Sequence, residues 1–163
     1  MVLEVMATSS TMTGEDTYVF LRVFSDGTAE CQLLNRGDLE KKETPTIKKA
    51  LSQDGFVRIK SVLSNSRLAK LKSRYETRYA IVDTSTEWTI KVLRPGQTQV
   101  IQVLEFAPGL ARAMKHPYPD ALVKLGCSIE DLRAELSGEP NFHDGECKRI
   151  LGTKSRSWPQ SAL

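Results

Sequence analysis

The chain has 163 residues, with 40% hydrophobic and 26% charged side chains and a formal net charge of +3. This length and composition are typical of a single globular domain and exclude an intrinsically disordered chain. No apolar run is long enough to span a bilayer, and residues 1–14 lack the basic and apolar regions of a secretory signal. The sequence leaves the compartment open: we expect an exported protein if a signal is removed upstream of Met1, and a cytoplasmic one otherwise.

The charges are unevenly distributed along the chain. Residues 1–40 carry a net charge of −5, whereas residues 41–75 contain ten Lys and Arg against two carboxylates and carry +8. Such a contrast points to an anionic partner more than to any feature of the fold.

Residues 1–16 are rich in Thr, Ser and Met without an evident hydrophobic period, and we expect a disordered leader. From Thr17 a β-branched and aromatic run leads to Asp26-Gly27, a strong hairpin signal. With these two as the loop residues, Phe24 faces Ala29, and the core side comprises Phe20, Phe24, Ala29, Cys31 and Leu33. A longer loop would change this register. Residues 35–46 are predicted to be a connection or a short edge segment.

A helix is predicted after Ser52, its N-cap, because apolar residues then recur at helical spacing from Phe56 to Leu63. A second short helical turn should end near Tyr75. Residues 87–106 predict a second hairpin around Pro95-Gly96, and its register places three pairs on one face: Trp88 with Val103, Ile90 with Ile101, and Val92 with Gln99.

A long helix is expected to begin at Pro119 and to stop at Gly138. Its apolar stripe comprises Leu122, Leu125, Ile129, Leu132 and Leu136. The predicted fold is therefore α+β: a four-stranded antiparallel sheet built from two hairpins (β-β-α-β-β-α), with the helices packed on one face. The domain would span residues 17–138 and be followed by a partly ordered tail, 139–163.

The three cysteines are too few for a disulfide framework, and no spacing suggests zinc. Cys127 is predicted to point away from the apolar stripe as a surface thiol. If the compartment is oxidising, one bridge can form, for which Cys147 is a partner with Cys127 as first candidate and Cys31 as second.

The sequence contains no catalytic motif, so we expect a protein that is not an enzyme and holds no cofactor or metal. His116 lies in a proline-rich loop. The cluster from His143 to Cys147 matches no standard metal spacing and is explained as a polar turn. Glu130 and Asp131 are adjacent on a helix and point in different directions, which does not suit acid–base chemistry.

The basic segment, residues 41–75, is the main indication of a partner. It could follow a phosphate backbone or meet an acidic protein surface, but interleaved aromatic residues are absent, and a solvated face is the simplest alternative. The candidate binding residues are its exposed cations: Lys48, Lys49, Arg58, Lys60, Arg67, Lys70, Lys72 and Arg74. The hairpin loops at Asp26-Gly27 and Pro95-Gly96 are further candidate contacts.

The order of these segments resembles emfourin: Leu-Arg-Val-Phe-Ser-Asp-Gly-Thr at 21–28, Leu-Ser-Gln-Asp-Gly-Phe at 51–56, Glu-Trp-Thr-Ile-Lys-Val at 87–92, and the closing Leu-rich helix. Emfourins are small inhibitors of thermolysin-like metalloproteases. The resemblance covers residues 17–136 and implies inhibition, although residues 35–50, the turn near Asn65 and the tail depart from the pattern. The plan is also similar to that of exported bacterial proteins without an assigned function.

Together these features predict a non-enzymatic binding or interaction module that recognises an acidic protein surface. The alternatives are an emfourin-like inhibitor of a thermolysin-type metalloprotease and a nucleic-acid-binding domain that uses the basic segment. We expect a protein partner, no membrane insertion and no cofactor. The sequence leaves the partner's identity and the oligomeric state open.

Overall fold

The computed structural model describes residues 1–11, 14–33, 45–76, 84–110, 118–139 and 144–152. Its strands are β1 (Leu3–Thr11), β2 (Gly14–Val23), β3 (Thr28–Gln32), β4 (Thr46–Ala50), β5 (Arg74–Tyr75), β6 (Thr84–Arg94) and β7 (Gln97–Leu104). Its helices are α1 (Gln53–Leu63), α2 (Asp120–Ser137) and α3 (Asp144–Leu151), with short 3₁₀ turns η1 (Leu68–Lys70) and η2 (Pro108–Leu110).

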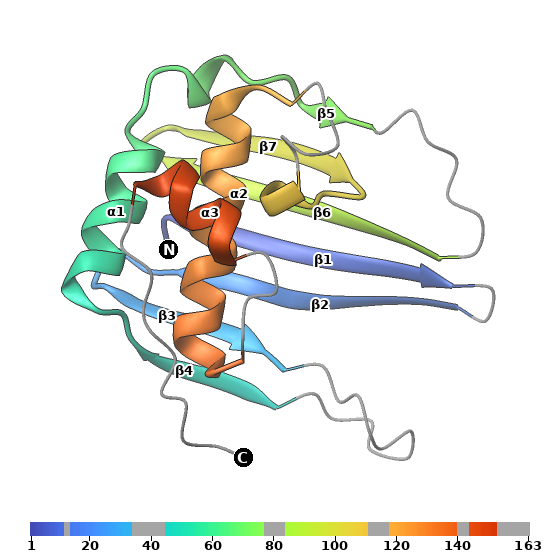
Figure 1. The fold of residues 1–163 in the computed structure, drawn as a ribbon, viewed down its shortest axis with the longest axis horizontal. Coiled ribbons are helices and arrows are strands. Elements are labelled where there is room, and N and C mark those ends of the chain that lie inside the picture. Colours follow the sequence, from blue (N-terminus) through green and yellow to red (C-terminus); the bar gives the residue numbers. More distant parts are fainter. Residues whose placement is uncertain (12–13, 34–44, 77–83, 111–117, 140–143, 153–163) are drawn as a thin grey trace.

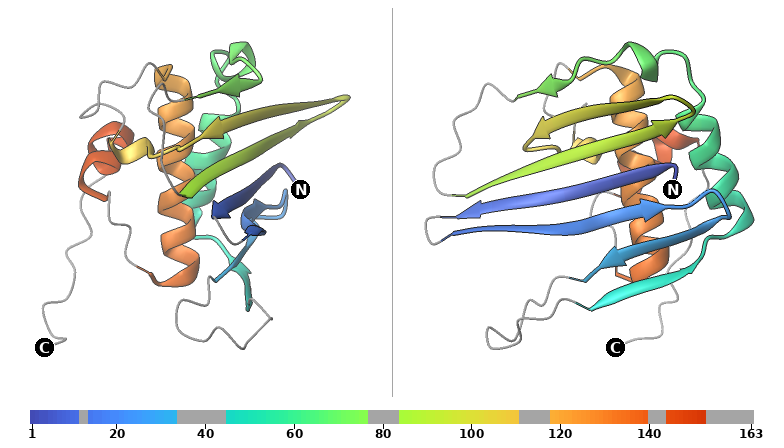
Figure 2. Two further views of the ribbon diagram at one scale, coloured as in Figure 1. Left: turned by 90° about the vertical axis from the view of Figure 1, so that its right-hand side faces the viewer. Right: turned by 180° about the vertical axis from the view of Figure 1, so that it is seen from behind.

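The strands form one open sheet in the order β4-β3-β2-β1-β6-β7-β5. Every pairing is antiparallel except that of β5 with β7. All three helices lie on one face, where α2 runs across the strands (Figure 1). Seen from behind, the opposite face of the sheet carries no described element (Figure 2, right). The molecule is thus a sheet covered on one side, and the core lies between the sheet and α2.

The α+β class with an antiparallel sheet is confirmed, but the four-stranded sheet is wrong: the sheet has seven strands. The largest error concerns residues 1–16, which were expected to be a disordered leader outside the fold. Leu3–Thr11 is instead the central strand β1, paired with both β2 and β6. Leu3, Val5 and Ala7 are completely buried, because alternate residues of a strand face the same side of the sheet and these three face the helices.

The hairpin of β6 and β7 confirms the predicted register. Trp88 pairs with Val103, Ile90 with Ile101, and Val92 with Gln99, around a turn in which Gly96 has a φ of +73°. Trp88 lies 4.5 Å from the Phe20 ring and 5.3 Å from the Phe106 ring, measured between centroids. This aromatic cluster joins the centre of the sheet to the helix layer.

The register predicted for the first hairpin is wrong by one residue. Arg22 pairs with Glu30 and Val23 with Ala29, and the backbone N–H of Phe24 donates to the carbonyl of Thr28 at 2.9 Å. The loop therefore has the three residues 25–27, and Gly27 takes a φ of +85°, as three-residue hairpins favour. Because a shift of one residue exchanges the faces of a strand, the fully buried residues of β2 are Leu21 and Val23.

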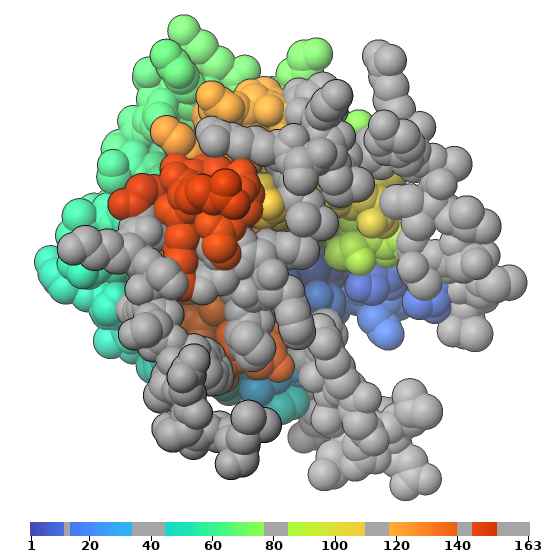
Figure 3. All heavy atoms as spheres, in the orientation of Figure 1, coloured from blue at the N-terminus to red at the C-terminus, as the bar shows by residue number. Residues whose placement is uncertain are grey.

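The helices follow the sequence closely. The Ser52 side chain caps α1 by accepting from the N–H of Gly55 at 3.1 Å. The whole predicted stripe of α2, Leu122, Leu125, Ile129, Leu132 and Leu136, is buried, and the helix ends at Gly138 in the left-handed conformation. Gly126 lets Phe106 approach α2, since a Cβ there would lie 2.5 Å from the Phe106 ring. The sequence did not predict α3, which forms the outermost layer of the covered face (Figure 3).

Candidate binding surface

The predicted basic residues are spread along the fold from β4 to β5. Lys48 and Lys49 lie on β4, at one edge of the sheet, whereas Arg74 lies on β5, at the opposite edge. Helix α1 and η1 connect the two edges: α1 carries Arg58 and Lys60, Arg67 directly precedes η1, and Lys70 ends it. Lys72 follows η1. The basic segment therefore runs from one edge of the sheet, along α1 and η1, to the opposite edge.

Two of these eight cations are neutralised within the molecule. Arg58 forms an ion pair with Asp131 of α2. The Arg74 guanidinium lies 2.5 Å from a Glu76 oxygen and 3.6 Å from one of Glu87, and the hydrogen bond to Glu76 raises the pKa of Arg74. These two arginines serve internal contacts and are weak candidates for binding.

The other six, Lys48, Lys49, Lys60, Arg67, Lys70 and Lys72, are exposed and form no ion pair with any residue that the structure describes. Two of them rest on aromatic rings. The Nζ of Lys48 lies 4.7 Å from the centroid of Phe24, and that of Lys60 lies 5.2 Å from the centroid of Phe56. Such contacts hold a cation in place and leave its charge available to an anion.

β4 also presents unpaired backbone groups. At its two ends the N–H of Leu33 donates to the carbonyl of Pro45 at 2.9 Å, and the N–H of Leu51 donates to the carbonyl of Gly27 at 3.0 Å. In an antiparallel ladder, alternate residues direct both backbone groups to the same neighbour. Ile47 and Lys49 therefore face β3, whereas the N–H and C=O groups of Thr46, Lys48 and Ala50 point away from the sheet.

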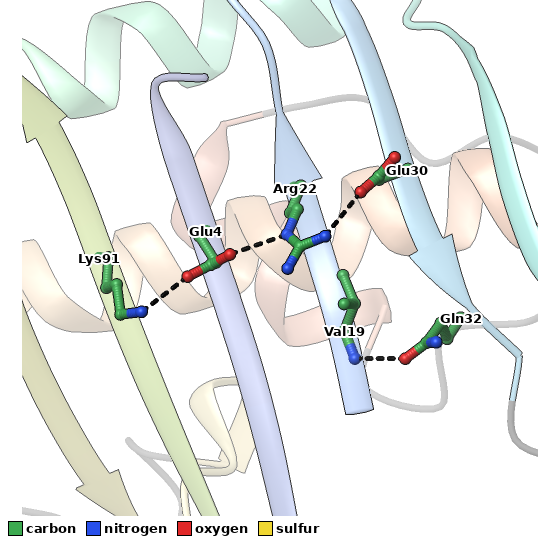
Figure 4. A network of polar contacts seen from close by, with 6 residues as sticks. All are labelled: Glu4, Val19, Arg22, Glu30, Gln32 and Lys91. Atoms are coloured by element: carbon green, nitrogen blue, oxygen red, sulfur yellow. Dashed lines mark hydrogen bonds and ion pairs between the residues drawn. The ribbon is translucent and has the colours of Figure 1, made fainter. Parts of the chain in front are cut away.

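The open face of the sheet carries a row of alternating charges (Figure 4). Reading across five strands, residues in register are Lys91 of β6, Glu4 of β1, Arg22 of β2, Glu30 of β3 and Lys48 of β4. Glu4 accepts from the Lys91 Nζ and the Arg22 Nε, both at 2.8 Å, and Glu30 accepts from Arg22 at 3.0 Å. Lys48 ends the row at the β4 edge.

The hydrogen bonds of this row favour the charged forms of Glu4 and Arg22. The hydrogen bond from Lys91 and the one from Arg22 lower the pKa of Glu4, although burial opposes them. The hydrogen bond to Glu30, followed by that to Glu4, raises the pKa of Arg22. The sequence alone did not predict a site at Glu4, Arg22, Glu30 and Lys91, because the row depends on β1. Leu3, Val5 and Ala7, apolar at every second position, were the signal that could have indicated β1.

Both candidate hairpin loops contact α1. A Cβ on Gly27 would lie 3.6 Å from the Phe56 ring, in the first turn of the helix, and Arg94 donates to the carbonyl of Leu63 at its end. The carboxylate of Asp26 accepts the N–H of Thr28 at 2.9 Å, and this bond lowers its pKa. Asp26 thus stabilises its own turn.

Cys127 and Cys147 form a disulfide, with their Cα atoms 5.1 Å apart. This is the first pairing that the sequence favoured, but Cys127 is completely buried beneath α3, and its prediction as a surface thiol is wrong. The disulfide attaches α3 to α2. Cys31 is free and buried, and burial raises the pKa of its thiol.

Glu130 lies beside this disulfide, with its Oε2 3.7 Å from the Sγ of Cys147. Burial raises the pKa of Glu130 to about 7. Its neighbour Asp131 pairs with Arg58, so the two carboxylates contact different helices and do not share a site.

Within the described residues, no three His, Cys, Asp or Glu side chains gather in a way that could hold a metal ion. Glu146 pairs with Arg149 in α3, and Cys147 belongs to the disulfide. His116 and His143 lie outside the described residues. None of the described helices is both long enough and apolar enough to cross a membrane.

No family model matches the sequence, and no curated protein is significantly similar to it. The resemblance to emfourin and to exported bacterial proteins therefore stays a prediction.

Proposed function

We propose that this protein is a non-enzymatic binding module that recognises an acidic surface of a partner protein. One observation carries the proposal: six of the eight candidate cations form no ion pair with a carboxylate of the described residues. The described part of the chain contains many carboxylates, so this is not for want of partners. Cations that are exposed and not neutralised contribute most to the electrostatic attraction of an anionic partner.

Two features favour an acidic protein over a nucleic acid. The track of cations that runs from β4 along α1 is interrupted at Arg58, whose charge Asp131 neutralises, whereas a phosphate backbone is followed by a continuous track of positive charge. The aromatic rings near the segment also have other contacts. Phe56 packs against the core, and Tyr75 lies edge-on to Tyr118 at 6.3 Å between centroids. They are not free to stack on bases.

A binding experiment with the full chain tests this function. The probes are a polyglutamate peptide, a DNA duplex and a thermolysin-like protease. We expect the polyglutamate peptide to bind, and its affinity to fall as salt screens the charges. Neutralising the six cations by substitution with Gln should abolish binding, whereas Lys124→Gln, at an exposed lysine of α2 outside the segment, should leave it unchanged.

Three results would overturn the proposal. Absence of polyglutamate binding would remove its basis. Tighter binding of the duplex than of polyglutamate would favour nucleic acid, and stoichiometric slowing of the protease would favour the inhibitor alternative.

A further inference from the structure

The β4 edge combines two properties that the rest of the basic segment lacks together. Thr46, Lys48 and Ala50 direct their backbone N–H and C=O groups away from β3, and no described strand pairs with them. The same strand carries Lys48 and Lys49. The opposite edge, β5, has only two residues, and its Arg74 is already paired with Glu76 and Glu87. Among the described strands, therefore, only β4 offers an extended chain both hydrogen-bonding groups and unneutralised charge.

The two lysines project to opposite faces of the sheet. Lys48 is in register with Glu30, on the open face, whereas Lys49 is in register with Ala29, whose side chain is buried beneath the helices. Neighbouring residues of an added strand also alternate between the two faces. Two consecutive carboxylates on such a strand would each meet one lysine.

Charge favours an acidic strand over a second copy of this chain as the occupant of the β4 edge. A second copy of the chain, pairing β4 antiparallel to itself about Lys48, would set the two Lys48 side chains opposite each other, and like charges in register are destabilising. Lysines on an edge strand oppose self-association in this way. An acidic strand meets no such repulsion.

We propose that β4 receives an extended acidic segment of the partner as an eighth strand, in which two consecutive Glu or Asp residues meet Lys48 and Lys49. This inference rests on the proposed function and adds its binding mode: backbone hydrogen bonds supply affinity and the paired carboxylates supply specificity. The Phe24 ring beneath the Lys48 Nζ holds that lysine at the edge.

Amide hydrogen exchange in the full chain tests the binding mode without any substitution. The probe is a synthetic peptide, Thr-Val-Glu-Glu-Val-Thr, which has about the length of an ordinary strand. The matched control replaces both Glu by Gln. On binding of the acidic peptide, exchange of the outward amides of Lys48 and Ala50 should slow by about tenfold or more. The amide of Lys49 faces β3 and should be slow already.

A substitution separates the backbone contact from the charge. Ala50→Pro removes an outward N–H, leaves both lysines in place, and spares the ladder with β3, because proline is tolerated on an edge strand where its nitrogen faces outward. We expect affinity for the acidic peptide to fall about tenfold, the loss of roughly one hydrogen bond. Ala50→Ser keeps the N–H and should bind as the parent does. Lys48→Gln with Lys49→Gln should remove the preference for Glu over Gln.

The outcomes distinguish the inference from the function it rests on. If polyglutamate binds but the exchange at Lys48 and Ala50 does not change, the strand addition is wrong and the proposed function stands. If neither polyglutamate nor the peptide binds, both are wrong. If these two amides are already protected in a dimer of the free protein, a second copy occupies the edge and the inference is wrong. Should Ala50→Pro fail to fold, the exchange measurement on the parent protein still decides.

Discussion

The two faces of the sheet are stabilised by different physics, and strand β1 contributes to both. Its odd-numbered residues Leu3, Val5 and Ala7 are completely buried against the helices. Its residue Glu4, on the other face, is held by Lys91 and Arg22 in a row of charges that remains in contact with water. Exclusion of water stabilises the covered face, and pairing of side chains stabilises the open one. The same strand can therefore be changed on either side to compare the two.

The largest effect is expected on the covered face. Leu3→Ala should lower the free energy of unfolding by about 4 kcal/mol, because Leu3 is completely buried in the central strand and its removal leaves a cavity. Met6→Ala, on the open side of the same strand, should cost about 1 kcal/mol or less. Denaturant unfolding of the two variants measures the difference. Equal losses would show that the two faces do not differ in this way.

An intermediate effect is expected from Glu130, a carboxyl within the helix layer. Burial raises its pKa from 4.5 to about 7, so the folded state binds the proton more tightly than the unfolded state. Its contribution to stability is complete below pH 4.5 and is lost as the pH rises through 7. By pH 8 this should cost about 2 kcal/mol, allowing for the exposed part of the side chain.

Glu130→Gln should remove that loss, and the variant should be more stable than the parent at pH 8. Asp131→Asn, at the neighbouring residue paired with Arg58, is the control and should not remove it. Thermal unfolding across this pH range checks the prediction, and an unchanged slope in Glu130→Gln would contradict it.

The smallest effect is expected on the open face. Glu4→Gln should lower stability by about 1 kcal/mol, since Glu4 is buried but its partners Arg22 and Lys91 are partly exposed, and ion pairs with partly exposed groups are weak. The pKa of Glu4 is lowered in the folded state, so its contribution is present above its ordinary pKa and is lost as the pH falls through the lowered value. This direction is opposite to that of Glu130. A loss that high salt does not reduce would argue against an electrostatic origin.

Local patterns predicted much of the fold. The β6–β7 hairpin has a strong alternation and a Pro-Gly turn, and its register is correct to the residue. The α2 stripe and its Gly138 stop follow from helical periodicity and the left-handed conformation that glycine accepts. The first hairpin shows the limit, because its loop has three residues and not two, and a sequence pattern does not distinguish these lengths when Ser25 precedes Asp26-Gly27.

The candidate site was predicted only in part. The basic residue types are as expected from the sequence, but their placement from one edge of the sheet to the other depends on a strand order that local patterns do not contain. Glu4 could not be linked to Lys91 or Arg22 while β1 was assigned to a leader. Thr and Ser dominate the strand beyond Ala7, and their composition resembles that of a disordered segment. It hides the strand pattern of Leu3, Val5 and Ala7.

By itself the sequence determined the class of the fold, the two hairpins and the two longer helices, and it favoured the cysteine pair that the structure joins. Each of these depends on residues close in the chain or on composition, where the period of apolar residues, a turn or a cap is sufficient. Only the tertiary structure decided that β1 lies at the centre, that four charged side chains from β1, β2, β3 and β6 meet in one row, and that β4 is an open edge. Those features depend on pairing between distant segments, whose free energy comes from burial and register across the whole sheet.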